Sequence, residues 1–154
     1  MDEMIEKLQN DIQTFLSVAT WISKQDGQRV QKMLPLLRVR LDNLEEAMEV
    51  HMDLVMDLGW LVSKYERIHR EAESAVTRHK AKFIADEYKI NTENMTQHRA
   101  NSVAESDPKY HQLQDEASRK SQWVSFLSTL RWSLKDRVEM ASNLSKRNGG
   151  FGTS

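Results

Sequence analysis

Basic and aromatic residues are interleaved between residues 64 and 89. Tyr65, Phe83 and Tyr88 lie among seven Lys and Arg residues in this segment. This combination is typical of proteins that bind single-stranded nucleic acid, because cations neutralise phosphates and rings stack on bases. Five acids dilute the charge of the segment, and Tyr65 and Phe83 also lie on an apolar stripe, so packing is an alternative role for the rings. The bases that we predict to contact nucleic acid are Lys64, Arg67, Arg70, Arg78, Lys80 and Lys82.

Other chemistry has little support in the residue pattern. Glu66 and His69 have the Glu-x-x-His spacing of carboxylate-bridged metal sites in helical bundles. Such a site needs two of these pairs and two further Glu residues, and the sequence contains one pair. The chain has no cysteine and no phosphate-binding glycine loop. We therefore predict no metal site, no cofactor and no enzymatic activity.

A long apolar stripe is the strongest structural signal. Between residues 37 and 83, fourteen positions follow one another at steps of four and three, and eleven of them are apolar. The pattern predicts one helix of about 47 residues, roughly 70 Å long. A chain of 154 residues has little to cover such a seam. We therefore expect partner chains or sister helices to cover it and predict an oligomer.

Histidine occupies the three remaining positions of the stripe, His51, His69 and His79. Polar residues at such positions pack against a neighbouring helix and fix its register. The alternative is an assembly that loosens below about pH 6.5, when buried imidazoles become charged.

Residues 48–62 are apolar on nearly every side of the predicted helix, which indicates burial on every side. This stretch should lie at the centre of a bundle or where subunits meet. The interface residues that we predict here are Met48, Met52, Val55 and Trp60.

The remaining elements are also predicted as helices. The spacing of apolar residues predicts helices at about 2–23, from 28 or 35 to 86, at 93–105 and at 108–146. Residues 24–28 are the best candidate for the first turn. Thr92 is an expected N-cap, and Asp107 followed by Pro108 predicts the start of the last helix. We expect one helical domain over residues 1–147 and a flexible tail at 148–154.

Composition agrees with an all-α protein. Apolar residues make up 39% of the chain and charged residues 29%, with five Gly and two Pro. No run of residues is apolar enough for a membrane span, and the acidic start is unlike a secretory signal, so we expect a cytosolic protein. The formal net charge is −1, but residues 1–60 hold six bases and eleven acids, whereas residues 61–154 hold sixteen bases and twelve acids. Such a basic half fits a polyanion, or the acidic half of a neighbouring copy.

Residues 61–146 resemble the UvsY-like family of phage recombination mediators. The resemblance begins with the cluster Lys80-Ala81-Lys82-Phe83, which is followed by Asp86, Glu87 and Tyr88. It continues with a polar link at residues 92–95, an acidic stop at residues 105–108, and a final helix that bears aromatics and spaced bases at residues 123–137.

This resemblance implies a cytoplasmic phage protein that acts in a bacterial host cell. Such a protein forms a ring-like homo-oligomer, binds single-stranded DNA, and helps to load a strand-exchange recombinase onto DNA coated with single-strand-binding protein. The resemblance also implies that Lys80 and Lys82 contact DNA and that the final helix serves self-assembly. The interface residues implied there are Trp123, Phe126, Leu127 and Leu134.

Two other functions fit the same residues. A structural or scaffolding protein, such as a virion component or an assembly chaperone, would use the stripe without binding nucleic acid. An adaptor would bind one protein through residues 48–62.

Overall fold

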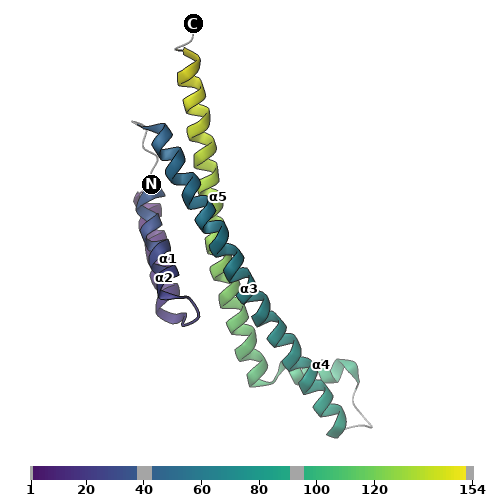
Figure 1. Ribbon diagram of the computed structural model, residues 1–154. Coiled ribbons are helices and arrows are strands. Elements are labelled where there is room, and N and C mark those ends of the chain that lie inside the picture. Colours follow the sequence, from purple (N-terminus) through teal and green to yellow (C-terminus); the bar gives the residue numbers. More distant parts are fainter. Residues whose placement is uncertain (1, 38–42, 91–95, 152–154) are drawn as a thin grey trace. The chain divides into compact units, whose positions relative to one another are not determined.

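The computed structural model describes residues 2–37, 43–90 and 96–151, and these residues form helices and no strands. The elements, in chain order, are α1 (Asp2–Val18), α2 (Lys24–Met33), the 3-10 helix η1 (Leu34–Leu37), α3 (Leu44–Ile90), α4 (Gln97–Glu105) and α5 (Pro108–Phe151) (Figure 1). The all-α fold predicted from the sequence is confirmed. Over the described ranges, no helix combines the length and the apolar character that a membrane span needs.

The residues pack as two compact units. The first unit consists of Met1–Val62 and Leu127–Ser154, and the second consists of Ser63–Phe126. Both α3 and α5 contribute to each unit. The length of α3 gives a physical reason, because 47 helical residues extend for about 70 Å and cannot all border one small core.

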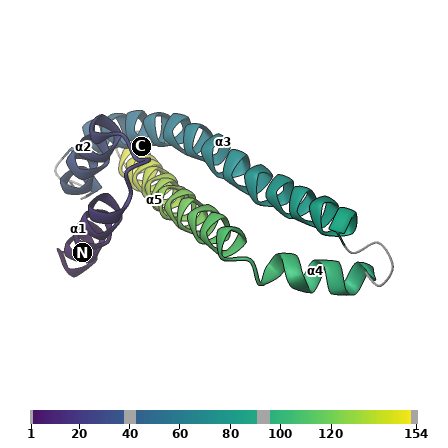
Figure 2. The same ribbon diagram turned by 90° about the horizontal axis from the view of Figure 1, so that it is seen from below.

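The first unit begins with α1 and α2, which pack against each other and against η1 (Figures 1 and 2). The turn predicted at residues 24–28 is wrong, because α1 ends at Val18 and α2 begins at Lys24. Ser23 is the N-cap of α2, and its Oγ accepts a hydrogen bond from the backbone N–H of Asp26 at 3.1 Å. Gly27 faces α1 so closely that an added Cβ would lie 2.6 Å from Leu16 Cδ2. Gly27 therefore marks a close helix contact, whereas the sequence suggested a turn.

The long helix begins later than predicted. Pro35 lies within η1, and α3 starts at Leu44, after Asn43. The Oδ1 atom of Asn43 accepts from the backbone N–H of Glu46 at 3.1 Å, and the Asn43 amide donates to Glu46 Oε2 at 3.0 Å. The first bond satisfies one backbone donor at the helix start, and the second joins the two side chains. Leu41, a position of the predicted stripe, lies outside the described residues. At its other end α3 continues to Ile90, four residues beyond the predicted end.

The carbonyl groups at the end of η1 tie three elements of the first unit together. His51 Nε2 of α3 donates to the Leu36 carbonyl at 2.7 Å, and Arg137 Nη1 of α5 donates to the Leu37 carbonyl at 2.6 Å. Carbonyls at a helix end lack partners within the helix, so these side chains take the place of water. His51 is 1% exposed and Leu37 is also buried. Burial lowers the pKa of His51, the hydrogen bond to Leu36 opposes this effect, and the charge of Arg137 lowers the pKa further.

The second unit combines the C-terminal part of α3 with α4 and the start of α5 (Figure 2). Thr96 caps α4 by accepting from the backbone N–H of Arg99 at 3.2 Å, whereas the predicted cap, Thr92, lies outside the described residues. The start of α5 agrees with the prediction, since Asp107 Oδ2 accepts from the backbone N–H of Tyr110 and Pro108 is the first helical residue. The helix continues to Phe151, into residues that we had predicted to form a flexible tail, and residues 152–154 lie outside the described part.

The two units have different cores. The first is aliphatic and includes Ile12, Leu58 and Leu134, which are completely buried. In the second unit, the Tyr65 ring meets the Trp123 ring edge to face, with centroids 5.9 Å apart. Trp123 also stacks on Phe126 with centroids 5.6 Å apart. These aromatic contacts lie between α3 and α5. The buried residues of α4 are the small side chains Ala100 and Ala104.

The buried imidazole of His51 should make stability depend on pH. Its pKa is lowered in the folded protein, so the unfolded chain takes up the proton first, and stability falls as the pH drops below about 6.5. We expect the thermal unfolding midpoint to decrease between pH 7.5 and pH 5.5. Replacing His51 by Gln, which can still donate to the Leu36 carbonyl, should make this decrease smaller. An equal decrease in His51→Gln would contradict the assignment of a buried neutral imidazole.

Candidate nucleic-acid interface

In the second unit, two side-chain pairs join α3 to the end of α4 and to the residues just after it. His79 Nε2 donates to Asp107 Oδ2 at 2.7 Å, and Lys80 Nζ donates to Glu105 Oε1 at 2.9 Å. The hydrogen bond from His79 is the main cause of the lowered pKa of Asp107. The hydrogen bond to Glu105 is the main cause of the raised pKa of Lys80, whose ammonium also lies 5.9 Å from the centroid of the Tyr110 ring. Lys80 is therefore positioned by residues of its own chain.

Other bases of α3 lie along one side of the helix. Their positions differ by three, eleven, four and seven residues, and each of these steps is close to a whole number of turns. Four of the five side chains are exposed, and the fifth, Lys64, is half-buried with its ammonium 5.4 Å from the Tyr65 ring centroid. We call these residues the cation strip: Lys64, Arg67, Arg78, Lys82 and Lys89.

The cation strip extends for about 37 Å along the helix. Within the described parts of the chain, no ion pair engages Arg67, Arg78, Lys82 or Lys89. Between residues 64 and 89, Glu71 and Asp86 are the acids on the same side of α3. A row of exposed cations with this little internal neutralisation can bind a polyanion along its backbone.

The six predicted nucleic-acid contacts are therefore not equivalent. Lys64, Arg67, Arg78 and Lys82 belong to the cation strip. Arg70 lies to one side, with its guanidinium 3.9 Å from Glu66 and its side chain 77% exposed. Lys80, which the resemblance singled out together with Lys82, is the base most engaged inside the chain.

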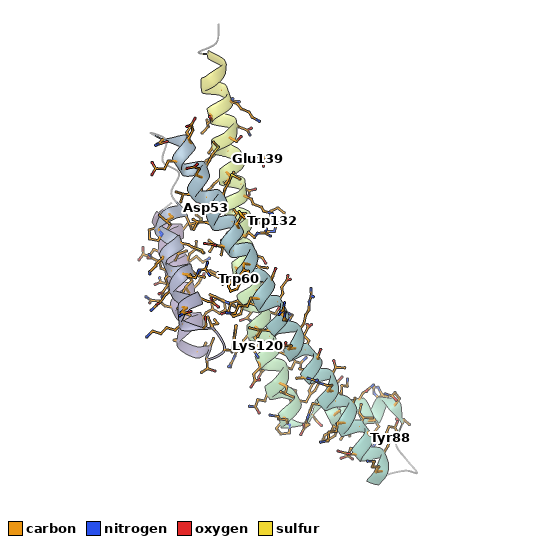
Figure 3. All side chains as sticks on the ribbon, in the orientation of Figure 1. Asp53, Trp60, Tyr88, Lys120, Trp132 and Glu139 are labelled. Atoms are coloured by element: carbon orange, nitrogen blue, oxygen red, sulfur yellow. The ribbon has the colours of Figure 1, made fainter. Side chains whose placement is uncertain are left out.

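The aromatic residues of this segment do not form an exposed platform. Tyr65 is 1% exposed, and Phe83 and Tyr88 are half-buried. Figure 3 shows Tyr88 near the C-terminal end of α3. The interleaved rings and bases in the sequence thus separate in space, with Tyr65 in the core and the bases outside. The site as it stands can hold phosphates, but the Tyr65 ring is not available to stack on bases.

An open groove of about 500 Å³ lies beside α3 and α5 in the second unit. Its lining includes His69 and Glu73 from α3 and Gln114, Ser118 and Ser121 from α5. His69 Nε2 lies 3.2 Å from Glu73 Oε1, so the imidazole contacts Glu73 one turn later in the helix. Among the described residues, no three His, Asp or Glu side chains gather closely enough to hold a metal ion.

The predicted interface residues come from α3 and α5 and differ in how far they are exposed. Trp123, Leu127 and Leu134 are completely buried within one chain, and Phe126 is half-buried. Met48 and Val55 are half-buried, and the Val55 carbonyl accepts from Arg131 Nε at 3.3 Å. Met52 and Trp60 are 55% and 57% exposed. Residues 48–62 are thus not buried on every side within the chain.

Three exposed residues were not among those that we predicted to contact nucleic acid or to form an interface. Lys89 completes the cation strip, and its spacing of seven from Lys82 was the available signal. Met56 is 73% exposed between Met52 and Trp60, at steps of four. Trp132 is 64% exposed on α5 and points to the same side of that helix as Glu139 (Figure 3). The sequence alone did not reveal which side of each helix the chain leaves uncovered.

Comparison of the chain with family models, with curated proteins and with solved structures finds no match in any of the three.

The difference between Lys80 and Lys82 can be measured by acylation. The raised pKa of Lys80 leaves less of the unprotonated amine, which is the reactive form, whereas Lys82 is exposed. In a brief treatment with an amine-acylating reagent at pH 8, we expect mass spectrometry to find slower modification of Lys80 than of Lys82. Glu105→Gln should increase the rate at Lys80 and leave Lys82 unchanged. Equal rates for the two lysines in the unaltered protein would contradict the Lys80–Glu105 pair.

Proposed function

We propose that this protein is a homo-oligomeric, coiled-coil-like helical protein that binds single-stranded DNA and acts as a recombination mediator. In this function it would bring a strand-exchange recombinase onto DNA coated with single-strand-binding protein. The observation that carries the proposal is the cation strip, a row of five bases on one side of α3. The resemblance of residues 61–146 to the UvsY-like mediators supplies the class of activity.

The binding chemistry would be electrostatic and independent of base sequence. Each phosphate neutralised on a single strand contributes about −0.7 to the slope of log affinity against log salt concentration. Five contacts in one chain would therefore give a slope of about −3.5. Because the Tyr65 ring is buried, we expect little discrimination among base sequences.

Assembly would compensate for the modest charge of one chain. The formal net charge is −1, so overall attraction to DNA is weak and the local strip must dominate. Linked copies that bind along one strand raise the effective concentration of each further contact. The exposed Met52, Met56 and Trp60 side chains favour such an assembly.

A scaffolding or virion assembly protein without a nucleic-acid role is the second candidate. The exposed apolar side chains favour this function equally, because it needs self-association alone. The pair formed by Lys80 and Glu105 also shows that a base of this segment can serve the fold. Binding of DNA at low salt separates the two candidates. Light scattering on the purified protein separates an adaptor, which should be small, from both assemblies.

Replacing Arg78 and Lys82 together by Ala should weaken binding of a fluorescent oligo-dT strand at low salt. Loss of two phosphate contacts should reduce the magnitude of the salt slope by about 1.4. The loss should be similar for mixed-sequence oligonucleotides. Fluorescence anisotropy titrations at several salt concentrations measure both quantities.

Lys24→Ala with Lys32→Ala is the matched control, because it removes the same amount of charge from exposed positions of α2. This control should leave the slope nearly unchanged. Lys80→Ala alone should weaken binding less than Lys82→Ala alone. No binding of oligo-dT by the unaltered protein at low salt would refute the nucleic-acid function.

A further inference from the structure

The N-terminal part of α3 exposes three large apolar side chains in a row. Met52, Met56 and Trp60 follow one another at steps of four and are 55%, 73% and 57% exposed. This spacing places them on one side of the helix, and we call them the apolar row. Arg29 of α2 lies 5.7 Å from the centroid of the Trp60 ring and forms an ion pair with Asp57 at 3.3 Å, so α2 positions the ring without covering it.

We propose that the apolar row is the contact between two copies of this chain, and that the two α3 helices meet antiparallel about a twofold axis at Met56. Met56 then contacts Met56 of the second copy, and Met52 of each copy contacts Trp60 of the other. The inference rests on the homo-oligomeric part of the proposed function.

The charges on either side of the apolar row select this orientation. Glu45 and Glu49 precede it on the same side of α3, and Lys64 and Arg67 follow it. In the antiparallel arrangement, Glu49 of one copy lies opposite Lys64 of the other. A parallel pair in register would instead place like charges opposite each other, which is unfavourable. The helix is therefore complementary to its own reversed copy, as a twofold contact requires.

The expected dimer is small. A shallow helix crossing of about 20° would allow contact from residue 45 to residue 67, a length of about 33 Å. A contact of this length and about 10 Å in width buries less than the roughly 800 Å² per partner of a standard interface. We therefore expect dissociation in the micromolar range, and the dimer must be sought over roughly 5–200 µM.

Mass measurement with one substitution tests the contact. Sedimentation equilibrium of the unaltered protein should give a concentration-dependent mass that approaches twice the chain mass of 18.0 kDa. Met56→Glu places two carboxylates at the axis, and the dissociation constant should increase at least about thirtyfold. Met4→Glu is the control, because Met4 is a 40% exposed methionine on α1. It should leave the dissociation constant unchanged.

A charge exchange tests the orientation. Glu49→Lys and Lys64→Glu should each weaken the dimer, because each places like charges opposite each other. The chain that carries both changes should recover most of the lost affinity, since the opposite charges are restored. Circular dichroism of every variant verifies that helix content is retained.

Each outcome decides the matter. A reduction in mass by Met56→Glu with recovery in the double charge variant supports the antiparallel contact. A monomer at 200 µM, a mass that Met56→Glu does not change, or a double variant as weak as the single variants overturns it. DNA binding by a protein that fails these tests would leave the proposed nucleic-acid function standing, and a dimer that does not bind oligo-dT would leave this inference standing.

Discussion

The length of α3 relative to its apolar surface is the constraint on which the rest of the structure depends. A helix of 47 residues with apolar side chains around much of its N-terminal half offers more apolar surface than the neighbouring helices cover. In the first unit, η1 contacts α3 at His51, α5 contacts it at Val55, and α2 contacts it at Asp57 and Trp60. The side that carries Met56 stays exposed. The covered side stabilises the fold, and the uncovered side is available for assembly.

Competition for basic side chains determines which of them remain for a ligand. Glu105, at the end of α4, engages Lys80, and Asp107, just after α4, engages His79. The carbonyl of Leu37 engages Arg137. These bases join elements together. Four members of the cation strip, Arg67, Arg78, Lys82 and Lys89, form no ion pair among the described residues. A chain with almost equal numbers of bases and acids can therefore still present a row of cations.

Much of the fold could be predicted from the sequence, because apolar spacing and capping residues act locally. The periodic stripe predicted a long helix, and Asp107 with Pro108 predicted the start of α5. The errors arose where tertiary contacts override local propensity. Gly27 suggested a turn, but its missing side chain allows α2 to approach Leu16. Asn43 caps the start of α3, and Asn is a common N-cap residue. We did not predict a helix start there because the apolar stripe continues across this position.

The site was less predictable, because neighbours in sequence can have different surroundings. Lys80 and Lys82 differ by two residues, which places them on different sides of a helix, and Lys80 meets Glu105 at the end of α4. Likewise, the apolar spacing did not reveal that Trp123 would be buried and Met56 exposed. Such differences depend on which helix lies alongside, and one sequence does not specify that directly.

The absence of cysteine from the sequence permits the most direct test of how two copies meet. With Cys at position 56, the two copies of this residue would face each other across the twofold axis. Their Cα atoms would lie within the separation of about 4.4–6.8 Å that a disulfide needs. Under mild oxidation we predict that Met56→Cys forms a covalent dimer rapidly and that Met52→Cys alone forms one slowly. When the Met52→Cys and Trp60→Cys proteins are mixed, we predict a disulfide between the two variants. Preferential self-linking of Met52→Cys, or no linking at position 56, would contradict the antiparallel contact.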